Sequence, residues 1–312
     1  MAATVVDAAA ADRLLTEEVA LVDRSERGKL ALTGAQAKEL LSGQVTNDIE
    51  ALTPGSGCYA ALLTNKGKML ADLRVLDTGS ELWIDTERMA LQALFDNLRR
   101  GAVGWQAELH KRTLQQALLS LVGPHAWRAV GGEVGPELAN RAAQLGGADV
   151  LLVATDLGVD VVCSAEDAER VRGALDVPVV SEAAAEVVRV ESGRPRYGLD
   201  LDDATIPQEG GLNERAVSFT KGCYVGQETV ARLHYRGKPN RHLRGLKLSQ
   251  PADRGTEITL DGKVVGRLGS TCVSPRLGPV ALALVRREAE PGATVSVDGA
   301  PAEVVDVPFS LG

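Results

Sequence analysis

The sequence predicts an α+β fold followed by a small C-terminal β-barrel, and three features of the chain lead to this prediction. Before residue 180, β-hairpins and amphipathic helices follow one another in the order hairpin, helix, hairpin, helix, which is typical of an α+β domain with a ferredoxin-like segment. From His242 onward the apolar residues alternate as they do in β-strands. The chain has 312 residues, which is long for a single core and favours two or three domains.

The first 115 residues are predicted to form an antiparallel sheet with two helices. Residues 21–32 read as two strands on either side of a turn, and Thr33 is a good N-cap for a helix that ends at Gly43. Residues 58–64, 69–76 and 82–84 read as successive hairpins. A helix is expected within residues 86–100, because apolar side chains recur there at helical spacing: Leu91, Leu94, Phe95 and Leu98. Residues 1–16 are alanine-rich and read as a frayed end or a short helix.

The next part of the chain repeats this arrangement. Residues 105–122 read as strand, residues 150–163 as a hairpin and residues 166–175 as a helix. Residues 131–147 are expected to be loop-rich, with one helical piece at 137–143. Ser181 is a good N-cap for a helix that runs to Glu191 and ends at Gly193.

The C-terminal part reads as strands only. Asp261-Gly262 and Asp298-Gly299 each lie between apolar runs, which is a strong signal for a tight hairpin. Six short strands joined in this way predict a small barrel. We therefore expect a first region over residues 1–240, made of two interleaved subdomains (roughly 1–115 and 116–240), and a barrel over residues 241–312.

Composition narrows the class of protein. With 45% apolar and 24% charged residues and a net charge of −8, the chain reads as an acidic globular protein, for which we expect no direct nucleic-acid binding. No window of 18 apolar residues predicts a membrane helix, and the first residues resemble neither a secretory signal nor a transit peptide. The four cysteines are far apart, which predicts a reducing cytoplasm and neither disulfides nor a local metal site. His234 and His242 lack a third metal ligand.

One stretch, residues 219–228, carries the strongest signal for chemistry. Gly222 and Gly226 flank Cys223, and Lys221 is close enough in sequence for its charge to favour a thiolate. From Lys221 to Lys247 there are seven Lys or Arg residues against one acid, which suggests a site for a discrete anion. The alternatives are a buried structural cysteine and a solvated basic face.

The octapeptide from Lys221 to Glu228 resembles the signature of the YgfZ family of folate-binding proteins. These are relatives of the glycine-cleavage T-protein (aminomethyltransferase) and are linked to iron–sulfur cluster assembly and repair. Three further stretches resemble both branches in the same order, from about residue 21 to residue 284: Leu32-Thr33-Gly34 with Gln44-Val45-Thr46-Asn47-Asp48, Arg189 to Pro195, and Tyr197 to Asp200 with Pro207 to Leu212.

The resemblance implies an aminomethyltransferase-like folate-binding fold, with tetrahydrofolate or a one-carbon derivative as the cofactor. It implies functional roles for Cys223, Lys221 and Asp72. It further implies folate contacts by the following residues: Glu191, Arg189, Asn47, Asp48, Tyr235, Arg236, Gln227 and Glu228. A carboxylate such as that of Glu191 can accept two N–H donors of a pterin ring at once, and Tyr235 and Arg236 could contact the aminobenzoyl-glutamate tail.

Ordinary structural roles remain open for several of these residues. Asn47 and Asp48 also suit a turn. Asp72 could be an outward strand residue paired with Arg74, and Glu191 could pair with Arg189 or Arg194 at the helix end. The T-protein has a Gly-Gly-x-x-Asp-Asp stretch in this region, whose acidic residue is needed for aminomethyl transfer. This chain has Gly67-Lys68-Met69-Leu70-Ala71-Asp72, which lacks one acid and one glycine of that pattern.

Three functions follow as hypotheses. The first is a tetrahydrofolate-binding protein that uses the Cys223 motif to support assembly or repair of iron–sulfur clusters in transient client enzymes. The second is a folate-dependent one-carbon transferase of the aminomethyltransferase type, against which Ala71 and the cysteine motif argue. The third is a ligand-gated interaction module in which Cys223 is structural.

Overall fold

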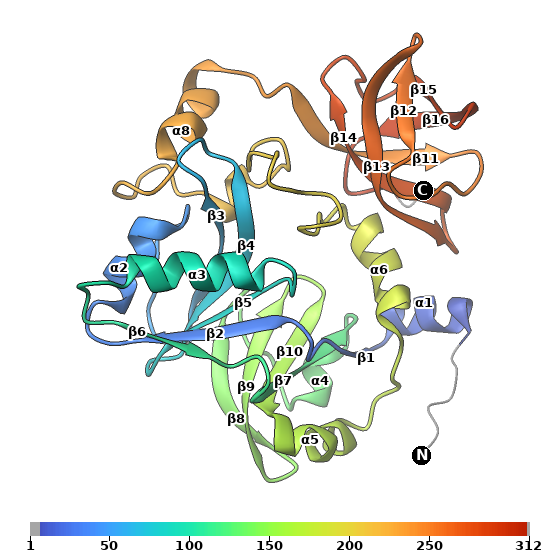
Figure 1. Ribbon diagram of the computed structural model, residues 1–312. Helices are drawn as coiled ribbons and strands as arrows, with labels where there is room; N and C mark the ends of the chain where they lie inside the picture. The colour runs from blue at the N-terminus through green and yellow to red at the C-terminus, as the bar shows by residue number, and fades with distance from the viewer. Residues whose placement is uncertain (1–6, 311–312) are drawn as a thin grey trace. The chain divides into compact units, whose positions relative to one another are not determined.

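The structure, a computed structural model, describes residues 7–310 (Figure 1). Contacts between residues divide the chain into two compact units. The first unit comprises the chain up to Leu63, Leu70–Ala185 and Arg215–Val225, and the second comprises Thr64–Met69, Glu186–Glu214 and the chain from Gly226 onward. This division interleaves the two units in sequence, and the domain limits expected from the sequence remain a prediction. Residues 1–6, part of the alanine-rich end, lie outside the described residues.

The first sheet of the first unit has five strands in the order β3-β4-β5-β2-β6. Their bounds are Gly57–Leu63 (β3), Met69–Asp77 (β4), Leu82–Thr86 (β5), Gly28–Thr33 (β2) and Glu108–Lys111 (β6). The predicted succession of hairpins over residues 58–84 is confirmed. Helices α2 (Ala37–Gln44) and α3 (Leu91–Gly101) lie beside this sheet (Figure 1), with Leu94 and Leu98 of α3 buried.

The second sheet has the order β1-β7-β10-β9-β8. Its strands are Ala20–Asp23 (β1), Gln116–Val122 (β7), Gly158–Ser164 (β10), Ala148–Thr155 (β9) and Asn140–Leu145 (β8), and the accompanying helices are α1 (Ala8–Glu17), α4 (Ala126–Ala129), η1 (Ala165–Asp167) and α5 (Ala168–Leu175). The helical piece predicted at residues 137–143 is wrong, because most of it belongs to β8. Gly146 and Gly147 both have positive φ (58° and 75°) and close a tight hairpin that pairs β8 with β9. This pairing overrides the helical preference of the alanines.

Residues from both sheets share one core cluster. Leu76 and Trp83 come from the first sheet, and Leu118, Val153 and Val162 come from the second. Arg74 also joins the sheets, because its guanidinium contacts Asp85 of β5 at 2.7 Å and Asp160 of β10 at 2.6 Å. The first unit is therefore two sheets joined by apolar packing and by buried ion pairs.

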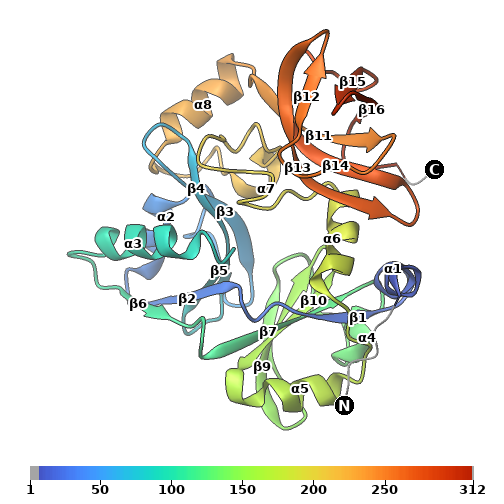
Figure 2. The same cartoon turned by 45° about the vertical axis from the view of Figure 1, so that its right-hand side comes forward.

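The second unit contains the C-terminal part of α6 (Glu182–Glu191), helix α8 (Gln227–Arg236) and the barrel, and the short α7 (Asn213–Ala216) lies where the chain passes between the two units. The barrel is closed, in the strand order β11-β14-β13-β12-β15-β16 (Figure 2). Its strands are Arg241–Leu248 (β11), Glu257–Leu260 (β12), Lys263–Ser274 (β13), Gly278–Arg286 (β14), Thr294–Val297 (β15) and Ala300–Val305 (β16). The Asp-Gly turns after Leu260 and Val297 have positive φ at both positions, which confirms the two predicted hairpins.

Helix α6 begins and ends where the sequence predicts. Ser181 Oγ accepts a hydrogen bond from the amide of Ala184, and Gly193 after the helix has a φ of 66°. Within the described residues, no helix has the length and apolar composition needed to cross a membrane.

Candidate functional site

Asp72 lies on β4 in the first unit, and its side chain is directed inward. The residue is only 7% exposed, and its Oδ2 accepts a hydrogen bond of 2.6 Å from the Tyr59 hydroxyl on β3. Among the described residues, no other side chain donates a hydrogen bond to this carboxylate. The alternative of an outward Asp72 paired with Arg74 is wrong, because Arg74 pairs with Asp85 and Asp160 instead.

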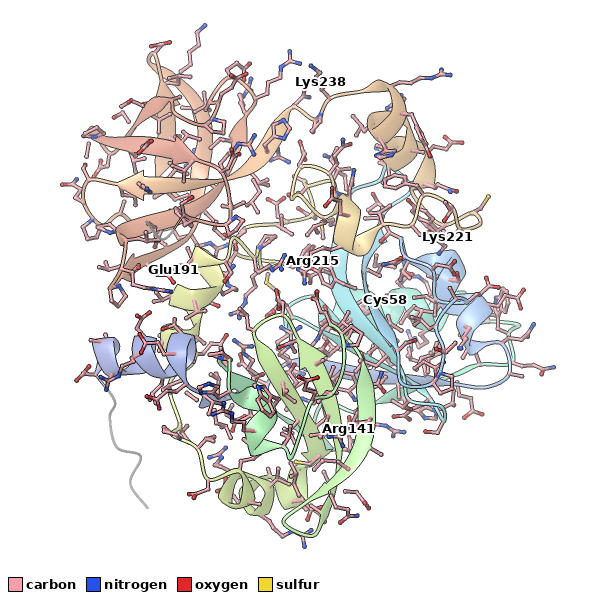
Figure 3. All side chains as sticks on the ribbon, turned by 180° about the vertical axis from the view of Figure 1, so that it is seen from behind. Cys58, Arg141, Glu191, Arg215, Lys221 and Lys238 are labelled. Atoms are coloured by element: carbon pink, nitrogen blue, oxygen red, sulfur yellow. The ribbon has the colours of Figure 1, made fainter. Side chains whose placement is uncertain are left out.

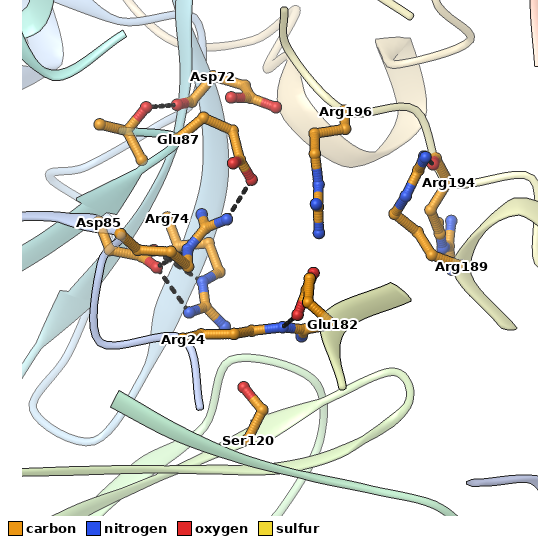
Figure 4. Close-up of polar contacts among 12 residues, drawn as sticks. Arg24, Asp72, Arg74, Asp85, Glu87, Ser120, Glu182, Arg189, Arg194 and Arg196 are labelled. Atoms are coloured by element: carbon orange, nitrogen blue, oxygen red, sulfur yellow. Dashed lines mark hydrogen bonds and ion pairs between the residues drawn. The ribbon is translucent and has the colours of Figure 1, made fainter. Parts of the chain in front are cut away.

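The environment of Asp72 makes it a readily titrated acid. Burial raises the pKa of Asp72 to about 6; the Tyr59 hydrogen bond and the charge of Arg27 oppose this rise, and the charge of Glu87 adds to it. Arg27 itself is held by Asp85 at 2.8 Å and by Glu87, as Figure 4 shows around the labelled Asp85 and Glu87. Asp72, Tyr59 and their charged neighbours, which we call the acid centre, therefore hold a carboxyl group that titrates about one pH unit below neutrality.

Arg215 completes the acid centre from a distant part of the chain. Its guanidinium carbon lies 5.6 Å from the centre of the Tyr59 ring, and the guanidinium pairs with Glu137 and lies 3.6 Å from Asp156. The Tyr59 hydroxyl is consequently fixed by a hydrogen bond at its tip and by a cation over its ring.

The segment that follows Arg215 carries Cys223, and it is attached to the loop after α2. Thr46 is fully buried; its hydroxyl donates to the carbonyl of Ala216 at 2.6 Å, and its own carbonyl accepts from the amide of Ser218 at 3.0 Å. The Asn47 side chain donates to the carbonyl of Tyr59 at 2.8 Å. We call residues 218–225 the thiol loop.

Lys221 fixes the thiol loop at its centre. Its Nζ donates to the backbone carbonyls of Val45 and Asn47, both at 2.9 Å, and to that of Ser42 (Figure 3 labels Lys221). Ser42 and Val45 lie at the C-terminal end of α2, where helix carbonyls lack partners and a cation is favourable. Burial lowers the pKa of Lys221 to about 8, against the opposing charges of Asp48 and Cys58.

Cys223 lies between two anchored residues and is itself exposed. Lys221 is held as described, and Tyr224 is only 7% exposed, with the Lys221 ammonium 5.2 Å from its ring centre. Cys223 is the only one of the four cysteines in the exposed class, and all four are free. A structural cysteine buried in the core, the alternative left open by the sequence, does not describe this residue.

The charge of Lys221 acts on the thiol of Cys58, which the sequence did not single out. Burial raises the pKa of Cys58 to about 12, and the charge of Lys221 opposes this rise. The Lys221 ammonium is directed at the carbonyls at the end of α2. An effect of Lys221 on Cys223 remains a prediction.

In the second unit, Glu191 ends α6 and faces the barrel. Its side chain is 3% exposed; it accepts from the hydroxyl of Ser274 on β13 and pairs with Arg276. The backbone carbonyl of Glu191 accepts from the amide of Phe309 at 2.9 Å. These contacts hold the carboxylate in one position.

Arg189, two residues earlier on α6, has its donors occupied within the same unit. It contacts Glu186 at 2.9 Å, Asp200 at 3.0 Å and the hydroxyl of Ser270 at 2.5 Å. Since its side chain is 8% exposed, Arg189 joins α6 to β13 and to the loop that carries Asp200.

The remaining predicted residues of the second unit lie on α8. Gln227 and Glu228 form its first turn after Gly226, and Tyr235 and Arg236 form its exposed last turn. Tyr235 is 67% exposed and its ring meets that of His234 edge to face at 4.8 Å. The structure thus groups Asn47, Asp48 and Lys221 together, and it places Asp72 beside Tyr59.

Known families account for nearly all of this chain. Residues 5–221 match the model of the GCVT N-terminal domain, and residues 241–310 match that of the glycine cleavage T-protein C-terminal barrel domain. The chain belongs to the glycine-cleavage T-protein family.

Two relatives of this T-protein family chain match it over more than nine-tenths of its length. It is 29% identical over 321 residues to the aminomethyltransferase of Streptomyces coelicolor, which covers 93% of this chain and 86% of that protein. Its fold is similar to that of the glycine cleavage system aminomethyltransferase T from Bartonella henselae, with a TM-score of 0.86, 24% identity and coverage of 96% and 89% of the two chains. The predicted aminomethyltransferase-like fold with its C-terminal barrel is confirmed.

Within the T-protein family framework, the residues that sequence reasoning missed are Tyr59, Arg215, Cys58 and Arg276. Tyr59 could have been found, because the predicted hairpin already places it on the strand facing Asp72. Arg215 and Arg276 could not have been found from the sequence. Arg215 is 156 residues from Tyr59, and Arg276 is 85 residues from Glu191. Among residues 7–310, no group of three or more His, Cys, Asp or Glu side chains could hold a metal ion.

Proposed function

We propose that this chain binds a reduced folate and serves one-carbon transfer of the aminomethyltransferase type. The observation that carries the proposal is the acid centre: a buried Asp72 whose pKa is raised to about 6, with Tyr59 as the one side chain among the described residues that donates to its carboxylate. Membership of the T-protein family and the likeness to aminomethyltransferases support it.

The acid centre fits a reduced folate chemically. A carboxylate that only one side chain holds can still accept a ligand N–H group, and a pterin ring offers several. Tetrahydrofolate supplies ring nitrogens that can carry a one-carbon unit. With a pKa of about 6, Asp72 is mostly ionised at neutral pH, so its Oδ1 can accept a hydrogen bond from such a nitrogen or take up a proton there.

The residues around Asp72 keep this carboxylate in place. Tyr59 fixes Oδ2 and therefore leaves Oδ1 for the ligand. Arg27 favours the ionised form, while burial and Glu87 favour the protonated form. The balance suits an acid that exchanges a proton during the reaction.

The test combines binding with turnover. Tetrahydrofolate is titrated by tryptophan fluorescence, and release of methylene-tetrahydrofolate from an aminomethyl carrier is assayed. Asp72→Asn is expected to lower turnover by a hundredfold or more, in the range for loss of an acid–base group. The matched control is Asp77→Asn, a second buried acid on β4 that pairs with Lys38 instead. Turnover unaffected by Asp72→Asn would overturn the proposed role of the acid centre.

A second candidate function is favoured by the exposure of Cys223. We propose, as the alternative, that the thiol supports assembly or repair of iron–sulfur clusters, as the likeness of the Lys221–Glu228 octapeptide to the YgfZ branch suggests. An exposed thiol on a loop anchored at Lys221 and Tyr224 is accessible to a client protein. The T-protein pattern has a second acid where this chain has Ala71, and its absence also favours the thiol function over aminomethyl transfer.

Two variants separate the candidates. In cells that lack the endogenous protein, Cys223→Ser is expected to reduce iron–sulfur enzyme activity if the second candidate is right, and Cys163→Ser, in which the altered thiol is buried, serves as the control. If Cys223→Ser restores these enzymes fully while Asp72→Asn does not, the thiol is dispensable. If methylene-tetrahydrofolate release is absent from a protein that binds tetrahydrofolate, the transferase proposal fails.

The predicted folate contacts of the second unit belong to the same proposal. Glu191 is held in position by Ser274 and Arg276, and Tyr235 and Arg236 are exposed on α8. Glu191→Ala is expected to weaken tetrahydrofolate binding by roughly tenfold, the value of one charge-assisted hydrogen bond. A cytoplasmic location, suggested by the four free cysteines, is also part of this proposal.

A further inference from the structure

A groove beside α3, separate from the acid centre and the thiol loop, has a second set of binding features. It encloses a cavity of about 280 Å³. Its residues come from β2, the start of α3 and the connection from β6 to β7: Leu30, Arg88, Leu91, Gln92, Phe95, Lys111, Thr113, Leu114 and Gln115. We call it the α3 groove, and all of it belongs to the first unit.

The α3 groove has an apolar lining. Leu30 is 1% exposed, and Leu91 and Phe95 are partly buried beside it. Leu114 is 82% exposed at the edge of the groove. Large aliphatic side chains exposed to this degree leave apolar surface that a ligand could cover.

Two cations border this lining without an acidic partner. Among the described residues, Arg88 and Lys111 form no ion pair. The Lys111 ammonium lies 4.4 Å from the centre of the Phe95 ring, so its charge is held over the apolar lining.

The neighbouring acids are already engaged elsewhere. Glu87 pairs with Arg27, and Asp96 accepts from Gln92 at 2.8 Å. Glu108 on β6 lies 4.0 Å from His110. The positive charge at the groove is therefore not neutralised by the elements packed around it.

We propose that the α3 groove binds a small carboxylate with an apolar body. The apolar lining matches the body, and the cations Arg88 and Lys111 match the carboxylate. At about 30 Å³ for each non-hydrogen atom, the volume per molecule of liquid water, the cavity accommodates about nine such atoms. The proposal assigns a binding site that is independent of one-carbon or thiol chemistry.

The test uses hexanoate as the probe and hexan-1-ol as a matched neutral ligand. Binding is followed by NMR of ¹³C-labelled leucine methyl groups in the full chain. Hexanoate is expected to shift the signals of Leu30, Leu91 and Leu114, and to bind several times more tightly than hexan-1-ol. Raising the salt concentration from 0.05 to 0.5 M is expected to weaken hexanoate binding and leave hexan-1-ol binding unchanged.

Variants that remove single cations show which of them contribute to hexanoate binding. Arg88→Met and Lys111→Met are each expected to weaken hexanoate binding by about two- to fivefold, the range for an exposed ion pair. Arg141→Met, which removes an exposed cation on β8 (labelled in Figure 3), is expected to have no effect. The proposal is overturned if hexanoate leaves these methyl signals unshifted, if the alcohol binds equally well, or if Arg141→Met weakens binding as much as the groove variants. The salt comparison needs no variant, so the test does not depend on their folding.

Discussion

Replacing Lys221 by methionine tests whether this residue fixes the thiol loop. Methionine keeps much of the length and apolar character of the side chain but removes the ammonium. In the structure, that ammonium donates to the carbonyls of Val45 and Asn47 at 2.9 Å each, and to that of Ser42. Lys221→Met is therefore expected to loosen residues 218–225 and the end of α2 together.

The magnitude follows from these three bonds. A hydrogen bond from a charged donor contributes about 1.5–3 kcal/mol net, and a cation at a helix C-terminus about 0.3–1 kcal/mol. Water can replace part of this, because Lys221 is only partly buried. We expect a local destabilisation of about 2–4 kcal/mol, which corresponds to amide exchange that is roughly 30- to 1000-fold faster.

Amide hydrogen exchange is the direct assay. The amide of Ser218, which donates to the carbonyl of Thr46 at 3.0 Å, and that of Val45, which donates to the carbonyl of Leu41 at 3.1 Å, report on the two sides of the contact. Lys66→Met, at an exposed lysine of the β3–β4 turn, is the matched control and is expected to leave both amides unchanged. Lys221→Arg, which keeps a charge and several donors, is expected to restore part of the protection.

The pH dependence gives a second readout with a definite sign. The pKa of Lys221 is lowered to about 8 from 10.5, so between these values the unfolded chain binds more protons than the folded chain. The contribution of Lys221 to the free energy of unfolding therefore increases as the pH rises from about 8 to about 10.5. Burial of the charge opposes the hydrogen bonds of Lys221 at neutral pH, and this cost disappears as the ammonium loses its proton, so the stability difference between the wild type and Lys221→Met should widen over this range. Unchanged exchange at Ser218 and Val45, or a difference that narrows with pH, would refute this account of Lys221.

Three further variants test the buried polar groups. Asp72→Asn should raise the free energy of unfolding at pH 8 by up to about 3 kcal/mol. The reason is that a pKa raised from 3.8 to about 6 means that the ionised carboxylate destabilises the fold above pH 6. Denaturant titration should show no such gain below pH 4, where the carboxyl group is protonated in both states. Tyr59→Phe should lower stability by about 0.5–1.5 kcal/mol and move the acidic limb of the pH–rate profile upward, because the hydroxyl that lowers the pKa of Asp72 is lost. Asp200→Asn should destabilise the second unit by about 3–5 kcal/mol in thermal unfolding, because Arg189 would lose a buried partner.

The elements with strong local signals could be predicted from the sequence. The Asp-Gly turns define two hairpins of the barrel, because few residues other than Gly, Asn and Asp readily adopt the required positive φ. Ser181 and Gly193 define helix α6 for similar reasons, by capping one end and terminating the other. These are interactions between residues close in sequence.

The wrong helix at residues 137–143 shows where local reasoning fails. The alanines and Arg141 have good helix propensity, and that preference is weak compared with pairing along a whole strand. The Gly146-Gly147 turn was the available signal, since two adjacent glycines suit a tight hairpin. Tertiary pairing decided the structure of this segment.

The same distinction between local and long-range interactions applies to the candidate site. Its residue types could be taken from the resemblance, but their partners could not be predicted. Lys221 is two residues from Cys223 in sequence, yet its ammonium binds carbonyls that lie 174 to 179 residues earlier in the chain. The sequence therefore contained no indication that the charge of Lys221 also acts on the thiol of Cys58, and an effect of Lys221 on Cys223 stays a prediction.

Asn47 connects the two chemical groups of the first unit. Its side chain donates to the carbonyl of Tyr59, the residue that positions Asp72, and its backbone carbonyl accepts from Lys221, the residue that anchors the thiol loop. The strand that carries Tyr59 and the loop that carries Cys223 are therefore joined through one residue. If either proposed chemistry is right, acid–base chemistry at Asp72 or thiol chemistry at Cys223, we expect it to depend on the same short connection after α2, because both Tyr59 and Lys221 are held there.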